Sequence, residues 1–301
     1  MRVFVTGASG FIGSAVVPEL IGAGHQVVGL ARSDAAAAAL AAAGAEVRRG
    51  DLDDLDSLRE GAAGADGVIH LAYNHDFSQY EAAARTETRV IETFGAALEG
   101  SGRPLVIAAG TAGLPAGRVG TERDLPDPDH PLRARSLAAQ SALALAGRGV
   151  RSSAVRLAPS VHSELKSGFV GLLVDIARAK GVSGYIGDGS NRWPAVHRLD
   201  AARLFRLALE NAPAGSALHG VADEGVPIRA VAEVIGRHLD VPVAEIPRED
   251  AGGHFGWLAT LLAADVPASS ALTRELLGWQ PTCPGLLDDL EKGHYFEDPA
   301  A

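Results

Sequence analysis

The sequence predicts an α/β fold built on a doubly wound parallel sheet. Short apolar runs alternate with longer alanine-rich stretches, which is the rhythm of repeated βαβ units. Several of these runs are apolar throughout, as strands covered by helices on both faces are. A glycine-rich turn, residues 7–13, directly follows the first run, where such sheets commonly bind nucleotides. These three features together predict the class.

Six apolar runs in the first half of the chain are predicted as strands: residues 2–6, 26–30, 45–47, 67–71, 105–108 and 153–157. The alanine-rich segment 34–43 is predicted as a helix, because Ser33 and Asp34 form a typical cap and Gly44 ends the pattern. Beyond about Ser160 the rhythm loosens. There we expect helices at 170–179, 201–210 and 228–239.

The chain of 301 residues is 47% hydrophobic and 21% charged, with a formal net charge of -10. This composition is typical of a globular protein and argues against a disordered or fibrous one. The acidic balance supplies no broad basic surface, so nucleic acid is not expected as a partner. No apolar run approaches the roughly 20 residues that span a bilayer, so no membrane partner is expected.

The single cysteine, Cys283, allows no disulfide within the chain and no zinc site built on several thiolates. We therefore expect no metal site. Residues 1–7 run directly into a strand and a glycine, without the basic start and apolar core of a secretion signal. Both features favour the cytoplasm as the compartment.

Two coupled regions without a long linker are expected. Residues 1–160 are predicted as a Rossmann-type NADP-binding domain, and residues 161–301 as a substrate-binding C-terminal region interleaved with it. The cleft between them is the expected place for a cofactor and a small-molecule substrate.

Glycines recur at every third position between the first predicted strand and the helix that follows it. Such a turn brings backbone N–H groups and a helix N-terminus onto a pyrophosphate. A tight turn without a ligand is the alternative, but the position within a βαβ unit favours a dinucleotide. We therefore predict cofactor contacts from Gly7, Ser9, Gly10, Phe11, Ile12 and Gly13.

The residues after the second strand favour NADP(H) over NAD(H). Arg32 and Ser33 stand where an NAD site usually offers an acidic residue to the ribose hydroxyls. The alternatives are that Arg32 is a solvated surface arginine and that Asp34 supports an NAD site instead.

After the third strand, Asp51 and Leu52 are predicted to flank the adenine. Asp51 equally suits a cap for the helix that starts at Asp54, and the two roles are compatible.

The chain resembles the extended short-chain dehydrogenase/reductase superfamily, the NAD(P)-dependent epimerase, dehydratase and reductase group, over nearly its full length. The segments that carry the resemblance are residues 6–13, 70–72, 156–159 and 187–201. The resemblance implies a seven-stranded parallel Rossmann core with a small C-terminal substrate domain, and often homodimers formed through two core helices. It also implies cofactor contacts from Leu71, Ala72, Ala108, Pro159 and Val161.

Members of that group protonate the substrate oxygen with a Tyr and a Lys four residues later, on the helix after the fifth strand, helped by a Ser or Thr. None of the four tyrosines in this chain has a Lys four residues later. The aligned positions hold Leu132 and Ser136, and Thr111 is the hydroxyl nearest to the Ser position. The sequence therefore predicts an atypical active site.

A positioned acid contributes about a hundred- to ten-thousandfold to such reactions. Either another residue supplies the proton, or a preprotonated substrate such as an iminium needs none, or the protein does not catalyse redox chemistry. Ligands bind beyond the carboxyl ends of the strands, so replacements are expected in the loops after strands four to six. Tyr73, and His75 beside Asp76, are candidate acids, and Thr111 is a candidate for holding the substrate oxygen. The alternative for Tyr73 and His75 is that they only line the pocket, and for Thr111 that it is a turn residue.

An apolar substrate pocket is predicted in the second region, lined by His162, Phe169, Tyr185, Trp193, Phe255 and Trp257. Trp193 stands where sugar-nucleotide enzymes of the group commonly carry a phosphate-binding arginine, which argues against a nucleotide sugar. Core packing is the alternative for the aromatic residues, above all for Phe169 and Trp257. His197, with Asp200, is expected to cap and brace a helix start.

The predicted function is an NADP(H)-dependent oxidoreductase that reduces a small, fairly apolar carbonyl or imine with a non-standard proton donor. One alternative is a catalytically silent NADP(H)-binding sensor or interaction protein, because the nucleotide motif is intact and the usual catalytic residues are absent. An isomerase or lyase on the same fold is the other alternative.

Overall fold

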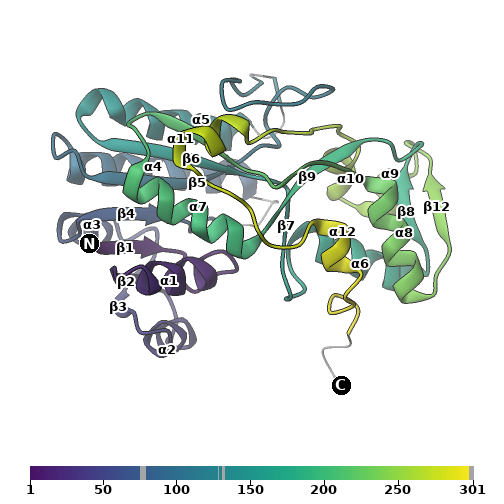
Figure 1. Cartoon of the computed structure of the whole chain (residues 1–301), viewed down its shortest axis with the longest axis horizontal. Coiled ribbons are helices and arrows are strands. Elements are labelled where there is room, and N and C mark those ends of the chain that lie inside the picture. Colours follow the sequence, from purple (N-terminus) through teal and green to yellow (C-terminus); the bar gives the residue numbers. More distant parts are fainter. Residues whose placement is uncertain (75–78, 128, 131–132, 298–301) are drawn as a thin grey trace.

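The computed structural model describes residues 1–74, 79–127, 129–130 and 133–297 (Figure 1). Within these ranges the chain forms two bodies, one around a large parallel sheet and one of smaller sheets and helices. No helix in the described ranges is long and apolar enough to cross a membrane.

The large sheet has seven strands in the order β10-β6-β5-β4-β1-β2-β3, and all neighbouring pairs are parallel. Their bounds are β1 (Arg2–Thr6), β2 (Gln26–Ala31), β3 (Glu46–Arg49), β4 (Gly67–His70), β5 (Pro104–Gly110), β6 (Arg151–Leu157) and β10 (Ser216–Gly220). This order places β1 inside the sheet between β2 and β4, where Val5 lies opposite Gly29 of β2 and Ile69 of β4. The predicted doubly wound Rossmann sheet is confirmed.

Helices cover both faces of this sheet, which explains why strands such as β1 are apolar at successive positions. Val3 and Val5 pack into a core with α1 (Gly13–Gly22) and α7 (Arg198–Asn211). Phe4 points to the other face, which is covered by α3 (Leu55–Ala63), α4 (Tyr80–Leu98), α5 (Arg133–Ala144) and the short 3-10 helix Leu145–Arg148. Buried apolar area on both faces is the main source of the stability of this body.

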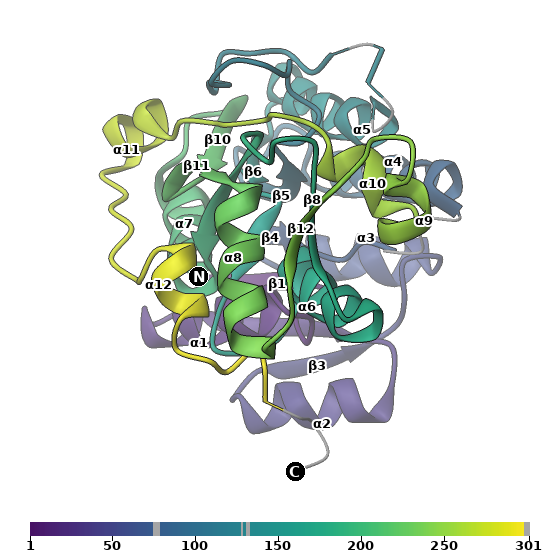
Figure 2. The same cartoon turned by 90° about the vertical axis from the view of Figure 1, so that its right-hand side faces the viewer.

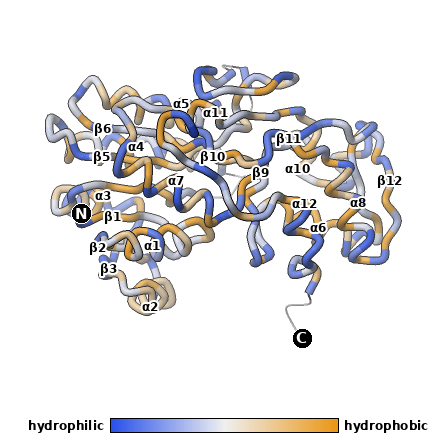
Figure 3. Tube along the Cα trace, viewed as in Figure 1, coloured by the Kyte–Doolittle hydropathy of each residue, from blue (hydrophilic) through white to orange (hydrophobic). Residues whose placement is uncertain are grey.

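The alanine-rich segment is helical, as the sequence predicted. It forms α2 (Asp34–Ala42), and the Ser33 side chain accepts a hydrogen bond from the N–H of Ala36 at 3.2 Å. Only Leu40 of this helix is buried, and the alanines around it colour the helix weakly hydrophobic in Figure 3. High helix propensity and the cap therefore stabilise α2 more than packing does.

The second body contains two small sheets and most of the C-terminal helices (Figure 2). Its three-stranded sheet has the order β11 (Asp223–Pro227), β9 (Arg192–His197) and β7 (Ser160–His162), and its two-stranded sheet pairs β12 (Val243–Ile246) with β8 (Ser183–Ile186). The helices are α6 (Gly168–Lys180), α8 (Ile228–Leu239), α9 (Ala251–Phe255), α10 (Leu258–Leu262) and α12 (Leu286–Leu290), while α11 (Ala271–Leu277) lies near β10.

The chain returns to the first body after entering the second. Helix α7 packs against α1, where Arg206 contacts Glu19 at 2.7 Å, and β10 then pairs with β6 at the sheet edge. The region beyond residue 160 therefore supplies part of the Rossmann sheet as well as the second body. The chain passes between the two bodies more than once, so several covalent connections hold them together on either side of the cleft.

Candidate active site

A cleft of about 2480 Å³ runs along the carboxyl ends of the central strands. The turns after β1, β2, β4, β5 and β6 form one wall. Residues of the second body close the opposite wall, among them Phe169 and Leu172 of α6 and Trp257 and Leu261 near α10. This is where open α/β sheets bind their ligands.

The glycine-rich turn makes the closest backbone approach in the cleft. Gly7 has φ +66°, and a Cβ there would lie 2.6 Å from the backbone nitrogen of Ala72. A Cβ on Gly13 would lie 2.1 Å from the Gly7 carbonyl oxygen. The helix that follows has no side-chain cap and no acidic residue in its first turn. Its positive N-terminus therefore faces the cleft, and this geometry suits an anionic pyrophosphate.

The structure brings together all fifteen residues that the sequence predicted as cofactor contacts. They line this one cleft although they come from six separate segments of the chain: Gly7, Ser9, Gly10, Phe11, Ile12, Gly13, Arg32, Ser33, Asp51, Leu52, Leu71, Ala72, Ala108, Pro159 and Val161. Their contact with a bound dinucleotide stays a prediction.

The end of β2 presents a basic residue to the cleft. Arg32 is exposed and lines the cleft beside Ser33. The Asp34 carboxylate pairs with Arg49, and Asp34 is not among the residues that line the cleft. Asp34 is therefore paired with Arg49 outside the cleft, and it does not stand where an NAD-selective aspartate would contact the ribose.

Asp51 differs in part from its prediction. Its carboxylate accepts hydrogen bonds from the N–H groups of Asp53 at 2.9 Å and Asp54 at 3.1 Å, so it stabilises the turn before α3. The cap of α3 is Asp54 itself, which accepts from the N–H of Ser57 at 3.0 Å. The expectation that Asp51 caps this helix was wrong. The helix begins at Leu55, so Asp54 occupies the N-cap position and the N–H groups that Asp51 binds precede the helix.

Of the three predicted catalytic residues, Tyr73 lies in the cleft wall. The guanidinium carbon of Arg135 on α5 stands 4.1 Å from the centre of its ring. His75 lies outside the described residues. Thr111 is 1% exposed and does not line the cleft, and its backbone N–H donates to Leu157 at 3.0 Å. The expectation that the Thr111 hydroxyl faces the substrate was therefore wrong, because this side chain is buried beside the cleft.

Tyr73 belongs to a polar cluster that also includes Tyr80, Glu87 and Arg135, all of which line the cleft. The Tyr80 hydroxyl accepts a hydrogen bond from the backbone N–H of Arg135 at 3.2 Å. Arg135 Nε lies 4.0 Å from the Glu87 carboxylate. Burial raises the pKa of Glu87 to about 7, although the nearby Arg135 opposes this shift. Burial likewise raises the pKa of Tyr73 to about 12, again against the effect of Arg135.

His70 stands at the end of β4, behind this cluster. Its Nδ1 lies 2.6 Å from the Thr6 hydroxyl, and its ring contacts Phe94 edge to face. Burial, followed by the repulsion from Arg135, lowers the pKa of His70 to about 4. The imidazole is therefore neutral at physiological pH.

The sequence did not predict that Glu87, Arg135 and Ser136 line the cleft. A Cβ on Gly113 would lie 2.5 Å from the Ser136 hydroxyl oxygen, and both residues line the cleft, so Ser136 supplies a hydroxyl where Thr111 does not. Glu87 carried a readable signal, because it follows Ala83 at a spacing of four and precedes Val90 by three on a buried helix face. An acid on such a face is unusual.

The comparisons with known proteins agree with this architecture. The model of the NAD dependent epimerase/dehydratase family matches residues 3–219. The chain belongs to this family. The resemblance to extended short-chain dehydrogenases/reductases expected from the sequence is thereby confirmed.

Two relatives of the chain cover it almost completely. An uncharacterized protein of Schizosaccharomyces pombe is 50% identical over 298 residues, which are 98% of this chain and 100% of that protein. An uncharacterized protein of Saccharomyces cerevisiae is 47% identical over 296 residues, 98% of this chain and 99% of the relative. The structure of UDP-glucose 4-epimerase from Thermotoga maritima, solved with UDP-glucose, is similar with a TM-score of 0.77 at 20% identity, covering 98% of both chains.

In this epimerase/dehydratase family member, only part of the predicted substrate pocket faces the cleft. Phe169 and Trp257 line it, with ring centres 6.0 Å apart. Trp193 is 1% exposed, and its ring centre lies 5.8 Å from that of Phe169. Tyr185 packs under Arg229, whose guanidinium carbon is 5.4 Å from the ring centre.

Phe255, like Trp193 and Tyr185, does not line the cleft, because it is buried in the core of the second body. The prediction of Tyr185, Trp193 and Phe255 as pocket residues was therefore wrong. Core packing, the alternative for aromatic side chains, describes Trp193 and Phe255.

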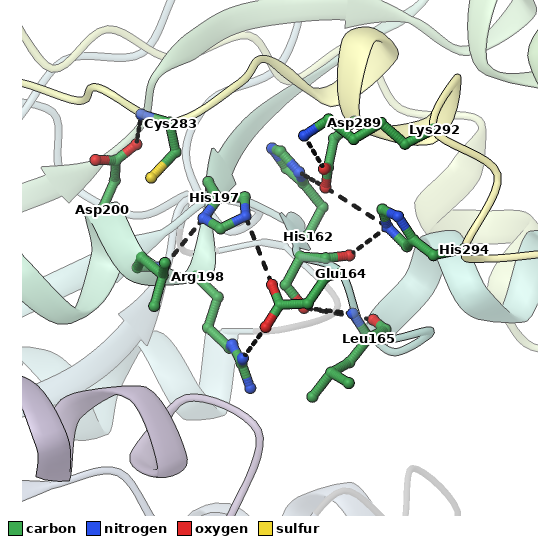
Figure 4. A network of polar contacts seen from close by, with 12 residues as sticks. His162, Glu164, Leu165, His197, Arg198, Asp200, Cys283, Asp289, Lys292 and His294 are labelled. Atoms are coloured by element: carbon green, nitrogen blue, oxygen red, sulfur yellow. Dashed lines mark hydrogen bonds and ion pairs between the residues drawn. The ribbon is translucent and has the colours of Figure 1, made fainter.

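His162 also lies outside the cleft, in the polar network of Figure 4. It is fully buried, with Nδ1 2.8 Å from the Asp289 carboxylate of α12. His197 caps α7 as predicted, since its Nδ1 accepts from the N–H of Leu199 at 3.2 Å. The prediction of His162 as a pocket residue was wrong, because its ring is used to fasten the C-terminal segment.

The same network positions one edge of the cleft. Glu164, in the segment after β7, lines the cleft and accepts from Arg198 at 2.7 Å. The guanidinium carbon of Arg198 lies 5.3 Å from the ring centre of Phe11 in the glycine-rich turn. His294 contacts the Ser163 carbonyl oxygen at 2.8 Å (Figure 4). The C-terminal segment therefore holds the cleft edge through this network.

Proposed function

We propose that the protein is an NADP(H)-dependent oxidoreductase that reduces a small, apolar carbonyl or imine, with Tyr73 as proton donor. The observation that carries the proposal is the contact of Arg135 with Tyr73, 4.1 Å from guanidinium carbon to ring centre, in the wall of the cleft that holds the nucleotide motif. A phenol and a cation in contact provide the same chemical elements as the Tyr and Lys of the wider family.

The residues of the cleft fit an NADP cofactor. The N-terminus of α1 and the turn at Gly7 suit a pyrophosphate, because the helix has no side-chain cap and no acidic residue in its first turn. Arg32 and Ser33 suit a 2′-phosphate, since a guanidinium pairs strongly with phosphate oxygens. NADPH bound here would supply the hydride for the reduction.

Tyr73 supplies the proton that the substrate oxygen or nitrogen needs. Burial disfavours the phenolate of Tyr73, and the Arg135 charge over the ring partly offsets that cost. Ser136, beside Gly113 in the same wall, holds the substrate oxygen by hydrogen bonding. An iminium substrate would need no donor, which makes imines the substrates least dependent on Tyr73.

The substrate end of the cleft favours an apolar molecule. Phe169 and Trp257 form an aromatic pair there, and Leu172 lies beside them. Arg192, which precedes Trp193, is paired with Asp265 at 2.9 Å. That arginine is therefore engaged in a protein ion pair and does not serve a diphosphate group, which disfavours a sugar nucleotide.

The test is oxidation of NADPH by the purified protein over a panel of ketones, aldehydes and cyclic imines, with NADH and UDP-glucose as controls. We expect turnover with NADPH and an aromatic or alicyclic carbonyl or imine. Cofactor binding without turnover across the panel would support the sensor alternative. Product formation without a net change in NADPH absorbance would support the isomerase or lyase alternative.

Tyr73→Phe separates the proposed donor from the rest of the site. Loss of a positioned acid lowers kcat for a ketone by about a hundred- to ten-thousandfold and leaves NADPH binding intact. Tyr185→Phe is the matched control, because Tyr185 lies outside the cleft under Arg229. Unchanged ketone reduction by the Tyr73 variant would remove Tyr73 from the mechanism.

We also propose a homodimer, which the family resemblance implies. Sedimentation of the purified protein measures this directly, and a single species of the mass of one chain, 30.9 kDa, would contradict it.

A further inference from the structure

Glu87 is a buried acid that lines the cleft. It is 4% exposed, and its Oε2 has no hydrogen bond within the described part of the chain. The nearest cation is Arg135, whose Nε lies 4.0 Å away, too far for a hydrogen bond. That Nε is also buried without a hydrogen bond among the described residues.

Such an arrangement is costly for a structural ion pair. A buried carboxylate and a buried guanidinium are stable together when hydrogen bonds join them, and here they are held apart. Protonation of the carboxyl removes the larger part of this cost. Burial accordingly raises the pKa of Glu87 to about 7. Near neutral pH the carboxyl therefore exists in both forms, as a proton store requires.

The groups around Glu87 belong to the proposed catalytic site. Arg135 faces it from α5, and Tyr73 and Tyr80 lie on the segment that leads from β4 into α4. The charge of Glu87 raises the pKa of both tyrosines, while Arg135 lowers it. Glu81 acts on the tyrosines in the same direction as Glu87, but it is exposed.

His70 approaches the cluster from β4 and carries no charge near neutral pH, because burial lowers its pKa to about 4. Within the described residues, Glu87 is therefore the buried group of this cluster that changes charge near pH 7.

We propose that Glu87 is a positioning residue that stores the proton of the Tyr73–Arg135 pair and returns it to Tyr73 after each reduction. The inference rests on the proposed function. In the forward step the Tyr73 O–H bond breaks, and its proton forms an O–H bond on the reduced carbonyl oxygen, which leaves a phenolate beside Arg135. The Glu87 O–H bond then breaks and restores the phenol, directly or through one water. The Glu87 carboxylate regains a proton from solvent.

The direction of this transfer is favourable. The pKa of Tyr73 is raised to about 12 and that of Glu87 to about 7, so the proton moves from the stronger acid to the phenolate. The negative charge then lies on Glu87, whose carboxylate is 4.0 Å from Nε of the same guanidinium. The anion formed in each turnover, first the Tyr73 phenolate and then the Glu87 carboxylate, therefore always has Arg135 as a neighbour, which avoids an isolated buried anion.

The test compares Glu87→Gln, Glu87→Asp and Glu92→Gln in the full-length protein. Glu92 is the matched control, because it lies on the same helix but is exposed and pairs with Arg148 at 3.0 Å. In wild-type protein, kcat for a ketone falls as pH rises through about 7, as the store empties. The Glu87→Gln variant loses this limb and turns over roughly tenfold or more slowly, whereas Glu87→Asp and Glu92→Gln keep the limb.

A second readout does not depend on turnover. Infrared difference spectra between acidic and alkaline protein should contain the carbonyl stretch of one protonated carboxyl that titrates near pH 7 and disappears in Glu87→Gln. A Glu87 that is already ionised at about pH 6, or a Glu87→Gln variant with the wild-type pH profile, would overturn the inference.

The two proposals fail in distinguishable ways. If Tyr73→Phe abolishes ketone reduction and Glu87→Gln does not alter it, the donor stands and the proton store is wrong. If Tyr73→Phe reduces ketones normally, the proposed donor is wrong, and the store falls with it even where the infrared band is present.

Discussion

His162 and Asp289 are joined across the interior of the second body by a contact of 2.8 Å between Nδ1 and the carboxylate, although 127 positions separate them in the sequence. Both side chains are buried, at 0% and 2% exposure. The pair fastens α12 to the end of β7, directly before the segment that forms the cleft edge (Figure 4). A residue pair outside the glycine-rich turn therefore holds part of the cleft.

Removal of the Asp289 carboxylate should destabilise the protein. Burial lowers the pKa of His162, so Asp289→Ala leaves a neutral ring nitrogen buried without its hydrogen-bond partner, which costs about 1 to 3 kcal/mol. Urea unfolding followed by tryptophan fluorescence measures the loss. Asp288→Ala, at the neighbouring position of the same short helix, is the control. A change below about 1 kcal/mol for Asp289→Ala would mean that the pair contributes little.

The Gly13 position should tolerate no side chain. In Gly13→Ala the new Cβ would lie 2.1 Å from the Gly7 carbonyl oxygen, so the glycine-rich turn must move. We expect NADPH binding to weaken by at least about a hundredfold, measured by the fluorescence of the bound cofactor. Gly22→Ala on the same helix meets no atom within 4 Å and should keep wild-type affinity. Equal affinity for both variants would contradict the assigned phosphate site.

Arg32 should decide between the two nicotinamide cofactors. Arg32→Ala removes the guanidinium proposed for the 2′-phosphate, and loss of such a charged hydrogen bond costs about 1.5 to 3 kcal/mol. The Kd for NADPH should rise by roughly ten- to a hundredfold while that for NADH changes little. The matched arginine is Arg59, which is exposed and pairs with Asp56 on α3. Parallel losses for both cofactors would show that Arg32 does not read the phosphate.

Glu87 should make the stability of the protein depend on pH. Its pKa is raised in the folded state from 4.5 to about 7, so the folded protein binds more protons in this interval. Its contribution to stability is fully present below about pH 4.5 and is lost as pH rises through about 7. The loss amounts to about 3 kcal/mol.

The measurement is the difference in unfolding free energy between wild type and Glu87→Gln as a function of pH. A difference is needed because the buried His70 and His219, whose pKa values burial lowers to about 4, change stability in the opposite direction over part of this range. A constant difference between wild type and variant from about pH 5 to 8 would show that Glu87 is ionised throughout.

Local chemistry let the sequence predict the central sheet and the nucleotide turn. The strand at Arg2–Thr6 and the helix at Ile228–Leu239 lie at the predicted bounds, because burial on both faces or on one face leaves a periodic pattern in the chain. The Gly7 to Gly13 turn is equally local, since backbone conformation and close approach within seven residues require its glycines. All fifteen predicted cofactor residues accordingly line one cleft.

The tertiary structure decided which side chains reach that cleft. Phe169 and Trp193 are both aromatic residues of the second region, yet Phe169 lines the cleft and Trp193 lies buried behind it. Neither composition nor spacing distinguishes them, because the outcome depends on how α6 packs within the second body. Packing likewise buries Thr111, whereas Ser136 of α5 lines the cleft.

Glu87, Arg135 and Tyr73 come from two helices and a loop, and only the packing of α4 against α5 brings them together. The sequence by itself determined the fold and the glycine-rich turn proposed for the nucleotide, since both follow from short-range patterns and backbone geometry. The proposed acid–base cluster was decided by long-range packing, because the charge on each of its members depends on burial and on neighbours distant in the chain.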